Sequence, residues 1–187
     1  ADYFDWISLG PIDIGLARFQ EICCFHKPSK SLLVTDALVA IEETPPKLFE
    51  LDPTPLLFHA REKGSEELID TPTARRKGWL RLVLFASYLR PAKLEIPKIK
   101  EIFGNSFKPN LRNKRAHFGI YPFSWQKGWE LSAKKLVGKN IPLIQIAPVI
   151  ERLVFPRGQK ALITWLNKVQ SLQGLSWLIS AHYSGKV

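Results

Sequence analysis

A single carboxylate interrupts an otherwise apolar stretch of the chain. Asp36 stands in the segment SKSLLVTDALVAI, residues 29–41, whose aliphatic and β-branched side chains predict a buried strand. A buried carboxylate is stable only where a cation, a metal ion or hydrogen-bond donors surround it. We therefore expect Asp36 to be satisfied by backbone amides, by His182 or by a metal ion.

Two basic stretches, ARRKGWLR and PNLRNKRAHF, combine cations with aromatic residues. This composition binds phosphates and stacks on bases, and it also suits acidic protein faces and anionic lipid surfaces. The formal net charge of +10, from 27 Lys and Arg against 17 Asp and Glu, points to an anionic partner of one of these kinds. A solvated basic face without a dedicated partner is the alternative. The candidate contact residues are Arg75, Arg76, Lys77, Trp79, Arg81, Arg112, Lys114 and Arg115.

Spacing argues against most other chemistry. Cys23 and Cys24 are adjacent, so on a strand they point to opposite faces, and they form neither a disulfide nor a C-x-x-C zinc site. His26, His59 and His117 share no spacing typical of metal ligands. The serines lack a nucleophile-elbow context, and the glycines form no phosphate-binding loop. No apolar run of about 18 residues occurs, so we expect no transmembrane helix.

The N-terminal part of the chain is predicted to form strands. Residues 3–9 read as a strand that enters a turn at GPIDIG, and a hairpin around the turn KPSK follows. The second arm of this hairpin, Leu32–Ile41, is uniformly apolar, as in a strand covered on both sides. A proline-rich connector at 42–64 comes next. The first arm alternates between two faces, one of which carries Phe19, Glu21, Cys23 and Phe25.

Helices are predicted in most of the remaining chain. Thr71 can serve as an N-cap, with Pro72 at the first helical position of a long helix. The later elements are a short helix ending at Gly104, a helix from Ser124 to Gly138, a strand at 141–150, a helix at 157–172 and a last strand that delivers His182 to its tip. Strands and helices in this order predict an α/β fold, and we expect a single domain over residues 1–187.

Two stretches resemble the second half of the metallo-β-lactamase fold. EICCFHKPSKSLLVTDALVAI is similar to a hairpin that ends in an Asp bridging two metals, and LSWLISAHY is similar to the final strand, which presents a last His ligand. The resemblance implies that Asp36 and His182 occupy ligand positions, with Asp13 as a candidate third. It also implies half of an αββα sandwich, with a mixed sheet flanked by helices.

A closer resemblance covers nearly the whole chain. The strings LDPTPLLFHAR, TARRKGW and FGIYPFSWQKGW resemble a domain-of-unknown-function family of oxygenic phototrophs, itself distantly like metallo-β-lactamases. Such proteins are generally plastid-targeted in eukaryotes, so the resemblance implies a chloroplast location, stromal or peripheral to a membrane. The sequence begins at Ala1 and contains no Met, so we expect it to derive from a longer translation product.

The ligand set of the metallo-β-lactamase fold is sparse here. The H-x-H-x-D-H cluster of its first half has no counterpart, because no H-x-H occurs in the sequence. A catalytic zinc site needs about three protein ligands and an open position for water. We therefore expect no cofactor and a structural role for Asp36, and we keep a residual zinc, iron or manganese site as the alternative.

An incomplete sandwich leaves apolar surface exposed, at a cost of roughly 25 cal/mol per Å². We expect the arm Leu32–Ile41 to be shielded by a missing first half or by another protein. The leading hypothesis is a non-enzymatic accessory or scaffold subunit on a larger plastid assembly, such as a photosynthetic thylakoid complex, docked through residues 75–81 and 112–115. A metal-dependent hydrolase and an RNA-binding module are the alternatives.

Overall fold

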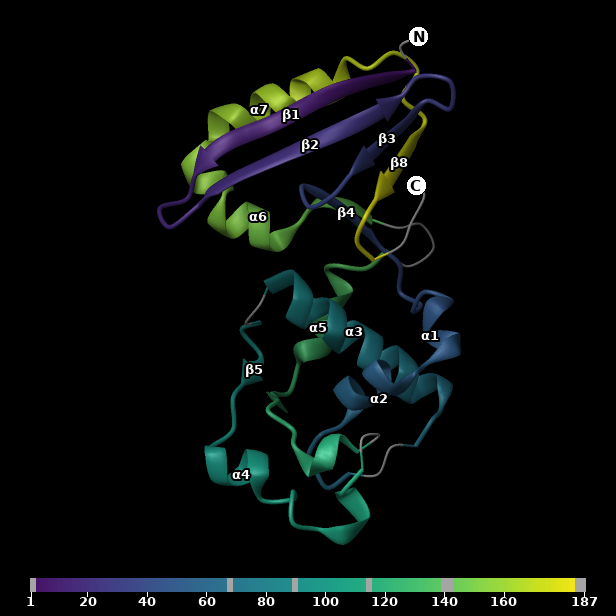
Figure 1. The fold of residues 1–187 in the computed structure, drawn as a ribbon, viewed down its shortest axis with the longest axis vertical. Helices are drawn as coiled ribbons and strands as arrows, with labels where there is room; N and C mark the ends of the chain where they lie inside the picture. Colours follow the sequence, from purple (N-terminus) through teal and green to yellow (C-terminus); the bar gives the residue numbers. More distant parts are fainter. Residues whose placement is uncertain (1–2, 67–68, 89–90, 114–115, 139–142, 184–187) are drawn as a thin grey trace. The chain divides into compact units, whose positions relative to one another are not determined.

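The computed structural model describes residues 3–66, 69–88, 91–113, 116–138 and 143–183 of the chain. Their contacts divide the chain into two units (Figure 1). Unit 1 comprises residues 1–42 and 137–187, and unit 2 comprises residues 43–136. The connector predicted at 42–64 is the entry to unit 2, and it contains two short helices, α1 (Leu48–Leu51) and α2 (Thr54–Ala60).

A four-stranded mixed sheet forms the centre of unit 1, in the order β1-β2-β3-β8. β1 (Phe4–Asp13) pairs antiparallel with β2 (Arg18–His26), and β2 pairs antiparallel with β3 (Ser31–Val34). β3 pairs parallel with β8 (Trp177–Ser180). The predicted α/β class with a mixed sheet and helices is confirmed, and so is the KPSK turn between β2 and β3.

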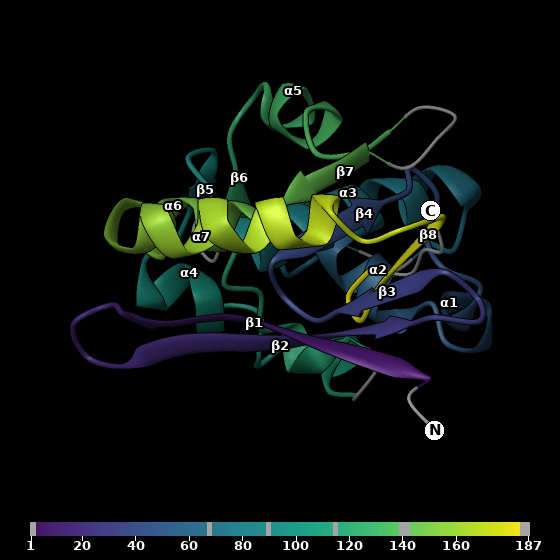
Figure 2. The same ribbon diagram turned by 90° about the horizontal axis from the view of Figure 1, so that it is seen from above.

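One helix covers one face of this sheet. α7 (Phe155–Gln170) follows α6 (Pro148–Leu153) and lies along the β1–β2 hairpin (Figures 1 and 2). It buries Leu162, Trp165 and Val169, which share one face of the helix as their spacing predicts. The inward side chains of the sheet therefore form a core with this face of α7.

The prediction of one continuous strand over Leu32–Ile41 is wrong. β3 ends at Val34, residues 35–37 form a bend, and β4 (Leu38–Ile41) pairs antiparallel with β7 (Leu143–Ile146) in a separate two-stranded sheet. All four residues of β4 are buried. The second part of the arm is thus shielded within unit 1 without a missing half or a partner, whereas Leu33 in β3 is 41% exposed.

Unit 2 is built on a pair of crossing helices. α2 packs against α3 (Pro72–Tyr88), which begins where the capping signal predicts, because Thr71 Oγ1 accepts a hydrogen bond from the Ala74 N–H at 3.1 Å. Gly78 allows the close crossing, since a Cβ at this position would lie 1.8 Å from the Leu56 carbonyl oxygen.

The other elements of unit 2 are short. The prediction of a helix from Ser124 to Gly138 is wrong. α5 spans only Trp129–Lys134, and the residues before it include strand β6 (Ser124–Trp125). The remaining elements are β5 (Leu94–Glu95), α4 (Ile99–Phe103) and two 3-10 turns, η1 (Pro109–Leu111) and η2 (His117–Gly119). Among the helices of the described residues, none combines the length and the apolar character needed to span a bilayer.

Candidate functional site

The structure brings together two of the three residues considered as metal ligands. Asp36 follows β3 and His182 follows β8, and because these strands are parallel neighbours, both residues leave the sheet at the same edge. His182 Nε2 lies 2.9 Å from Asp36 Oδ1, although the residues are 146 positions apart. Their side chains are 57% and 52% exposed, so the expectation that Asp36 is buried is wrong.

Asp13 takes no part in this pair. It ends β1, where its Oδ1 accepts a hydrogen bond from the Gly15 N–H at 2.8 Å. The described residues include no group of three or more His, Cys, Asp and Glu side chains that could hold a metal ion. Asp36 and His182 can supply two of the roughly three ligands that a catalytic zinc ion requires.

The buried carboxylate of unit 1 belongs to Glu21, which is 3% exposed. It accepts hydrogen bonds from the backbone N–H groups of Thr35, Asp36 and Ala37 at 2.9, 3.1 and 2.6 Å. These bonds fix the bend after β3 and so set the position of Asp36. The sequence carried a signal for this role, because the alternation of β2 places Glu21 on the same inward face as Phe25.

The first cations of the basic helix α3 are paired within unit 2. The pairs are Arg75–Asp70, Arg76–Glu43 and Lys77–Glu62. Arg75 binds both carboxylate oxygens, at 2.6 and 2.8 Å. Burial acts to raise the pKa of Glu62, but hydrogen bonds from Lys77 and Arg81 outweigh it and hold that pKa below its usual value. Arg75, Arg76 and Lys77 remain partly exposed at the surface.

Arg81 lies inside unit 2, with 1% of its side chain exposed. Its guanidinium donates to the Arg61 carbonyl oxygen at 2.7 Å and to both carboxylate oxygens of Glu62 at 2.8 and 3.0 Å. The rings of Trp129 and Trp125 lie 4.7 and 5.3 Å from its Cζ. Arg81 therefore neutralises the C-terminal end of α2, where the helix dipole is negative, and joins it to α3 and α5.

The other candidate contact residues have different surroundings. Trp79 is 2% exposed and belongs to the core of unit 2. Arg112 is exposed. Lys114 and Arg115 lie outside the described residues.

His59 is a buried histidine at the centre of an aromatic cluster in unit 2. Its ring centroid lies 5.2 Å from that of Phe123 and 6.1 Å from that of Phe85. Burial, together with the charges of Arg81 and His117, lowers the pKa of His59 to about 4. The imidazole is therefore neutral at pH 7 and acts as a core residue.

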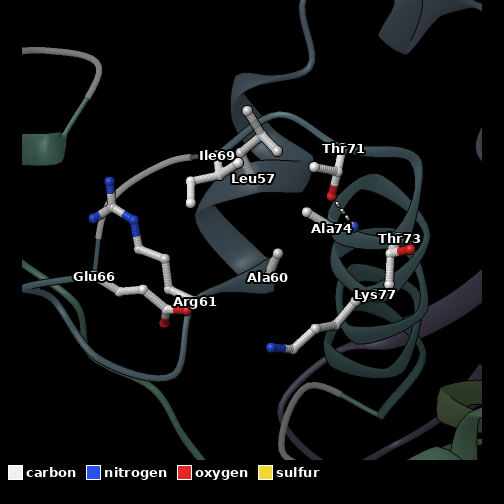
Figure 3. Close-up of a pocket in the computed structure, with 9 residues that line it drawn as sticks. All are labelled: Leu57, Ala60, Arg61, Glu66, Ile69, Thr71, Thr73, Ala74 and Lys77. Atoms are coloured by element: carbon white, nitrogen blue, oxygen red, sulfur yellow. Dashed lines mark hydrogen bonds between the residues drawn. The ribbon is translucent and has the colours of Figure 1, made fainter.

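A pocket of about 390 Å³ opens between α2 and the first turns of α3 (Figure 3). Leu57, Ala60 and Ile69 supply much of its apolar wall. Two of its polar groups from the start of α3 are engaged elsewhere: the Thr71 hydroxyl caps α3, and Lys77 pairs with Glu62. The pocket therefore offers apolar surface but no free charged group of α3 that would orient a ligand.

α7 lies on one face of the unit 1 sheet (Figure 2), and the opposite face carries an exposed apolar surface. Its large side chains are exposed by 41% to 69%, which is far more than a covered sheet face allows. We call this surface the outer sheet face and define it by Phe4, Trp6, Ile22, Leu33 and Trp177.

Strand register places four of these side chains in two neighbouring rows, and it places Ile22 in a third row, opposite Ser8. One row crosses all four strands through Trp6, Cys24, Leu33 and Ile179. The next row contains Phe4, His26, Ser31 and Trp177. The two rows contain no Asp, Glu, Lys or Arg. The sequence showed the second face of β2, but only the pairing of β1, β3 and β8 with it reveals one continuous surface.

Comparison with known proteins identifies the family of the chain. The model of the family described as domain of unknown function DUF4336 matches residues 1–187, so the chain belongs to this family. The predicted membership of a domain-of-unknown-function family is thereby confirmed. Searches of curated proteins and of solved structures found no match.

Proposed function

We propose that this member of the DUF4336 family is a non-catalytic accessory or scaffold subunit that docks on a protein partner through its outer sheet face. The observation that carries the proposal is the set of five large apolar side chains exposed on one face of a four-stranded sheet. The cores of protein interfaces are rich in aromatic residues and poor in charge. The two rows of the outer sheet face have this composition.

At β1, one of its two edge strands, the sheet favours packing on the face over extension by an added strand. β1 is an edge strand, and its exposed Pro11 has no N–H to donate to an added strand. Its register also shifts between Leu9 and Ile12. Both features oppose strand addition, whereas the outer sheet face next to them is open.

The partner should carry net negative charge. Two copies of a chain with net charge +10 repel each other, so charge opposes self-association through this face. Arg75, Arg76, Lys77 and Arg112 can add salt-sensitive contacts from unit 2 to the same acidic partner. Reversing these four charges should weaken co-purification with the partner, most strongly at low salt.

The family resemblance supports two finer proposals. The first is that unit 1 corresponds to one half of a metallo-β-lactamase-like αββα sandwich, in which a second sheet would occupy the outer sheet face. The resemblance to proteins of oxygenic phototrophs supports a chloroplast location and a photosynthetic thylakoid complex as the larger assembly.

The docking proposal is tested by size-exclusion of native extracts that contain the tagged chain. Wild type should elute with a larger assembly, whereas Trp6→Ser/Ile22→Ser should elute as the free chain. Ile163→Ser is the matched control, because Ile163 is 47% exposed on α7, the helix on the opposite face. Nuclease treatment should leave the assembly intact. Disassembly after nuclease treatment would favour the RNA-binding alternative. Co-elution of the double variant with the assembly would contradict docking through this face.

A metal-dependent hydrolase is the second candidate, and the pairing of Asp36 with His182 at 2.9 Å favours it. The two residues would serve as ligands to zinc, iron or manganese, with the remaining ligands supplied by another part of the site. Elemental analysis of the native protein tests this candidate. If the native protein contains stoichiometric metal and Asp36→Ala loses it, the non-catalytic proposal is wrong and the hydrolase is favoured.

A further inference from the structure

A second exposed apolar surface lies in unit 2, on α4 and its flanking chain. None of the five residues of α4 is buried. Figure 1 shows α4 at the end of unit 2 away from the α2–α3 pair. The exposed side chains are Ile96, Ile99, Phe103 and Phe107, at 65%, 75%, 48% and 76%. We call residues 96–108 the α4 segment.

Lysines alternate with these apolar side chains. Lys98, Lys100 and Lys108 are exposed, and Glu101 is the only acidic residue of the α4 segment. Within the described part of the chain, none of the three lysines forms an ion pair, in contrast to Arg75, Arg76 and Lys77 of α3. The α4 segment therefore presents uncompensated positive charge beside exposed apolar groups.

We propose that the α4 segment is a membrane-surface anchor that inserts Ile99, Phe103 and Phe107 at the headgroup boundary of an anionic bilayer. Apolar side chains flanked by lysines bind such a surface by burying apolar area while the ammonium groups contact anionic headgroups. A fluid bilayer accepts these three side chains from a short segment without a fitted pocket for each. This function goes beyond docking through the outer sheet face and involves the other unit.

Charge complementarity distinguishes this occupant from a second copy of the chain. The α4 segment carries three lysines against one glutamate, and the whole chain has a net charge of +10, so two copies repel each other. An anionic lipid surface attracts each lysine near the bilayer. The attraction falls as salt screens it, which makes salt dependence a diagnostic property.

Vesicle co-sedimentation of the full chain tests the proposal. The chain should bind phosphatidylcholine vesicles that contain phosphatidylglycerol and should bind pure phosphatidylcholine much more weakly. Lys98→Glu/Lys100→Glu/Lys108→Glu should weaken binding at least about 100-fold, because each lysine contributes about 1 kcal/mol. Phe103→Ser/Phe107→Ser should weaken it about tenfold or more, through the lost apolar burial.

Leu48→Ser/Leu51→Ser is the matched control, because these leucines are 71% and 85% exposed on α1 of the same unit. It should bind vesicles as wild type does. All substituted residues are exposed, so each variant should unfold at the wild-type temperature. Equal binding to neutral and anionic vesicles, or wild-type binding by either α4 variant, would overturn the anchor. Concentration-dependent self-association without lipid that the α4 variants abolish would instead assign the segment to an interface between copies.

Discussion

The tryptophans of the two units have opposite surroundings. In unit 2, Trp125 and Trp129 stack against the buried Arg81 and help to join three helices. In unit 1, Trp6 and Trp177 are 69% and 42% exposed on a sheet face that no described helix of the unit covers. Part of the basic and aromatic stretch ARRKGWLR therefore lies in the core of unit 2. The alternating strand β2 of unit 1, in contrast, contributes to the exposed apolar surface.

The carboxylates of the two units also differ in burial. Glu21 of unit 1 is buried and binds three backbone N–H groups, whereas the acidic partners of the α3 cations lie at the surface of unit 2. Surface ion pairs contribute about 0–1 kcal/mol, and a buried group that loses its partners costs more. Stability should therefore depend on a few buried polar residues, and docking should depend on exposed residues that stability does not require.

The largest effect on stability is expected from Arg81→Ala. The substitution removes the guanidinium from the Arg61 carbonyl oxygen and from Glu62, and it opens a space beside the rings of Trp125 and Trp129. We expect the free energy of unfolding to fall by about 3–5 kcal/mol in urea denaturation. Arg76→Ala is the matched control on the same helix, and a loss as large as that of Arg81→Ala would contradict the contrast between buried and surface cations.

The buried histidine of unit 2 should make stability depend on pH. Unfolded His59 takes up a proton near pH 6.5, whereas the folded residue stays neutral until about pH 4. Its contribution is therefore complete above pH 6.5 and is lost as the pH falls toward 4, by about 3 kcal/mol in all. His59→Phe should reduce this loss in urea titrations across the window. His182→Gln, at an exposed position of unit 1, should retain it.

Glu21→Gln tests the buried carboxylate of unit 1. The amide keeps the size of the side chain, but one acceptor oxygen becomes a donor that faces the N–H groups of Asp36 and Ala37. We expect unfolding to become easier by about 1–3 kcal/mol, and amide hydrogen exchange of residues 35–37 to accelerate. Gln20→Glu, at the next position but on the exposed face of β2, should change neither quantity appreciably.

The smallest effect on stability is expected on the outer sheet face. Trp6→Ser should change the free energy of unfolding by less than about 1 kcal/mol, because the side chain is mostly exposed. The same substitution should weaken docking by about 2 kcal/mol or more if Trp6 lies at the centre of the interface. A large loss of stability would show that this face is part of the core. It would contradict the distinction between buried residues that stabilise the fold and exposed residues that dock.

Local patterns predicted much of the fold. The alternation of β2, the KPSK turn, the Thr71 cap and the inward face of α7 all depend on residues close together in the sequence. The break at residues 35–37 was missed because Glu21, far along the chain, supplies its hydrogen bonds. The start of α5 was misjudged because Ser124 pairs in β6 with β5.

The candidate site was harder to predict because its residues come from segments far apart in the sequence. The resemblance implied ligand positions for Asp36 and His182, and this role stays a prediction. The structure places the two side chains 2.9 Å apart, because the strands that precede them are neighbours in the sheet. Nothing within ARRKGWLR distinguishes Arg81 from Arg76, since burial depends on Glu62 and on the two tryptophans of later segments. The outer sheet face likewise exists only once four separate strands are placed in register.

Alkylation of Cys24 tests the docking proposal most directly, because the outer sheet face needs no substitution. Cys24 is half-buried between Trp6 and Leu33 in one row, whereas Cys23 is buried on the inner face, where burial and Glu21 raise its thiol pKa. In the isolated chain, Cys24 should react with N-ethylmaleimide faster than Cys23, as mass spectrometry of the peptides would show. In the native assembly Cys24 should be protected, and equal reactivity of Cys24 in the free and assembled chain would contradict docking through the outer sheet face.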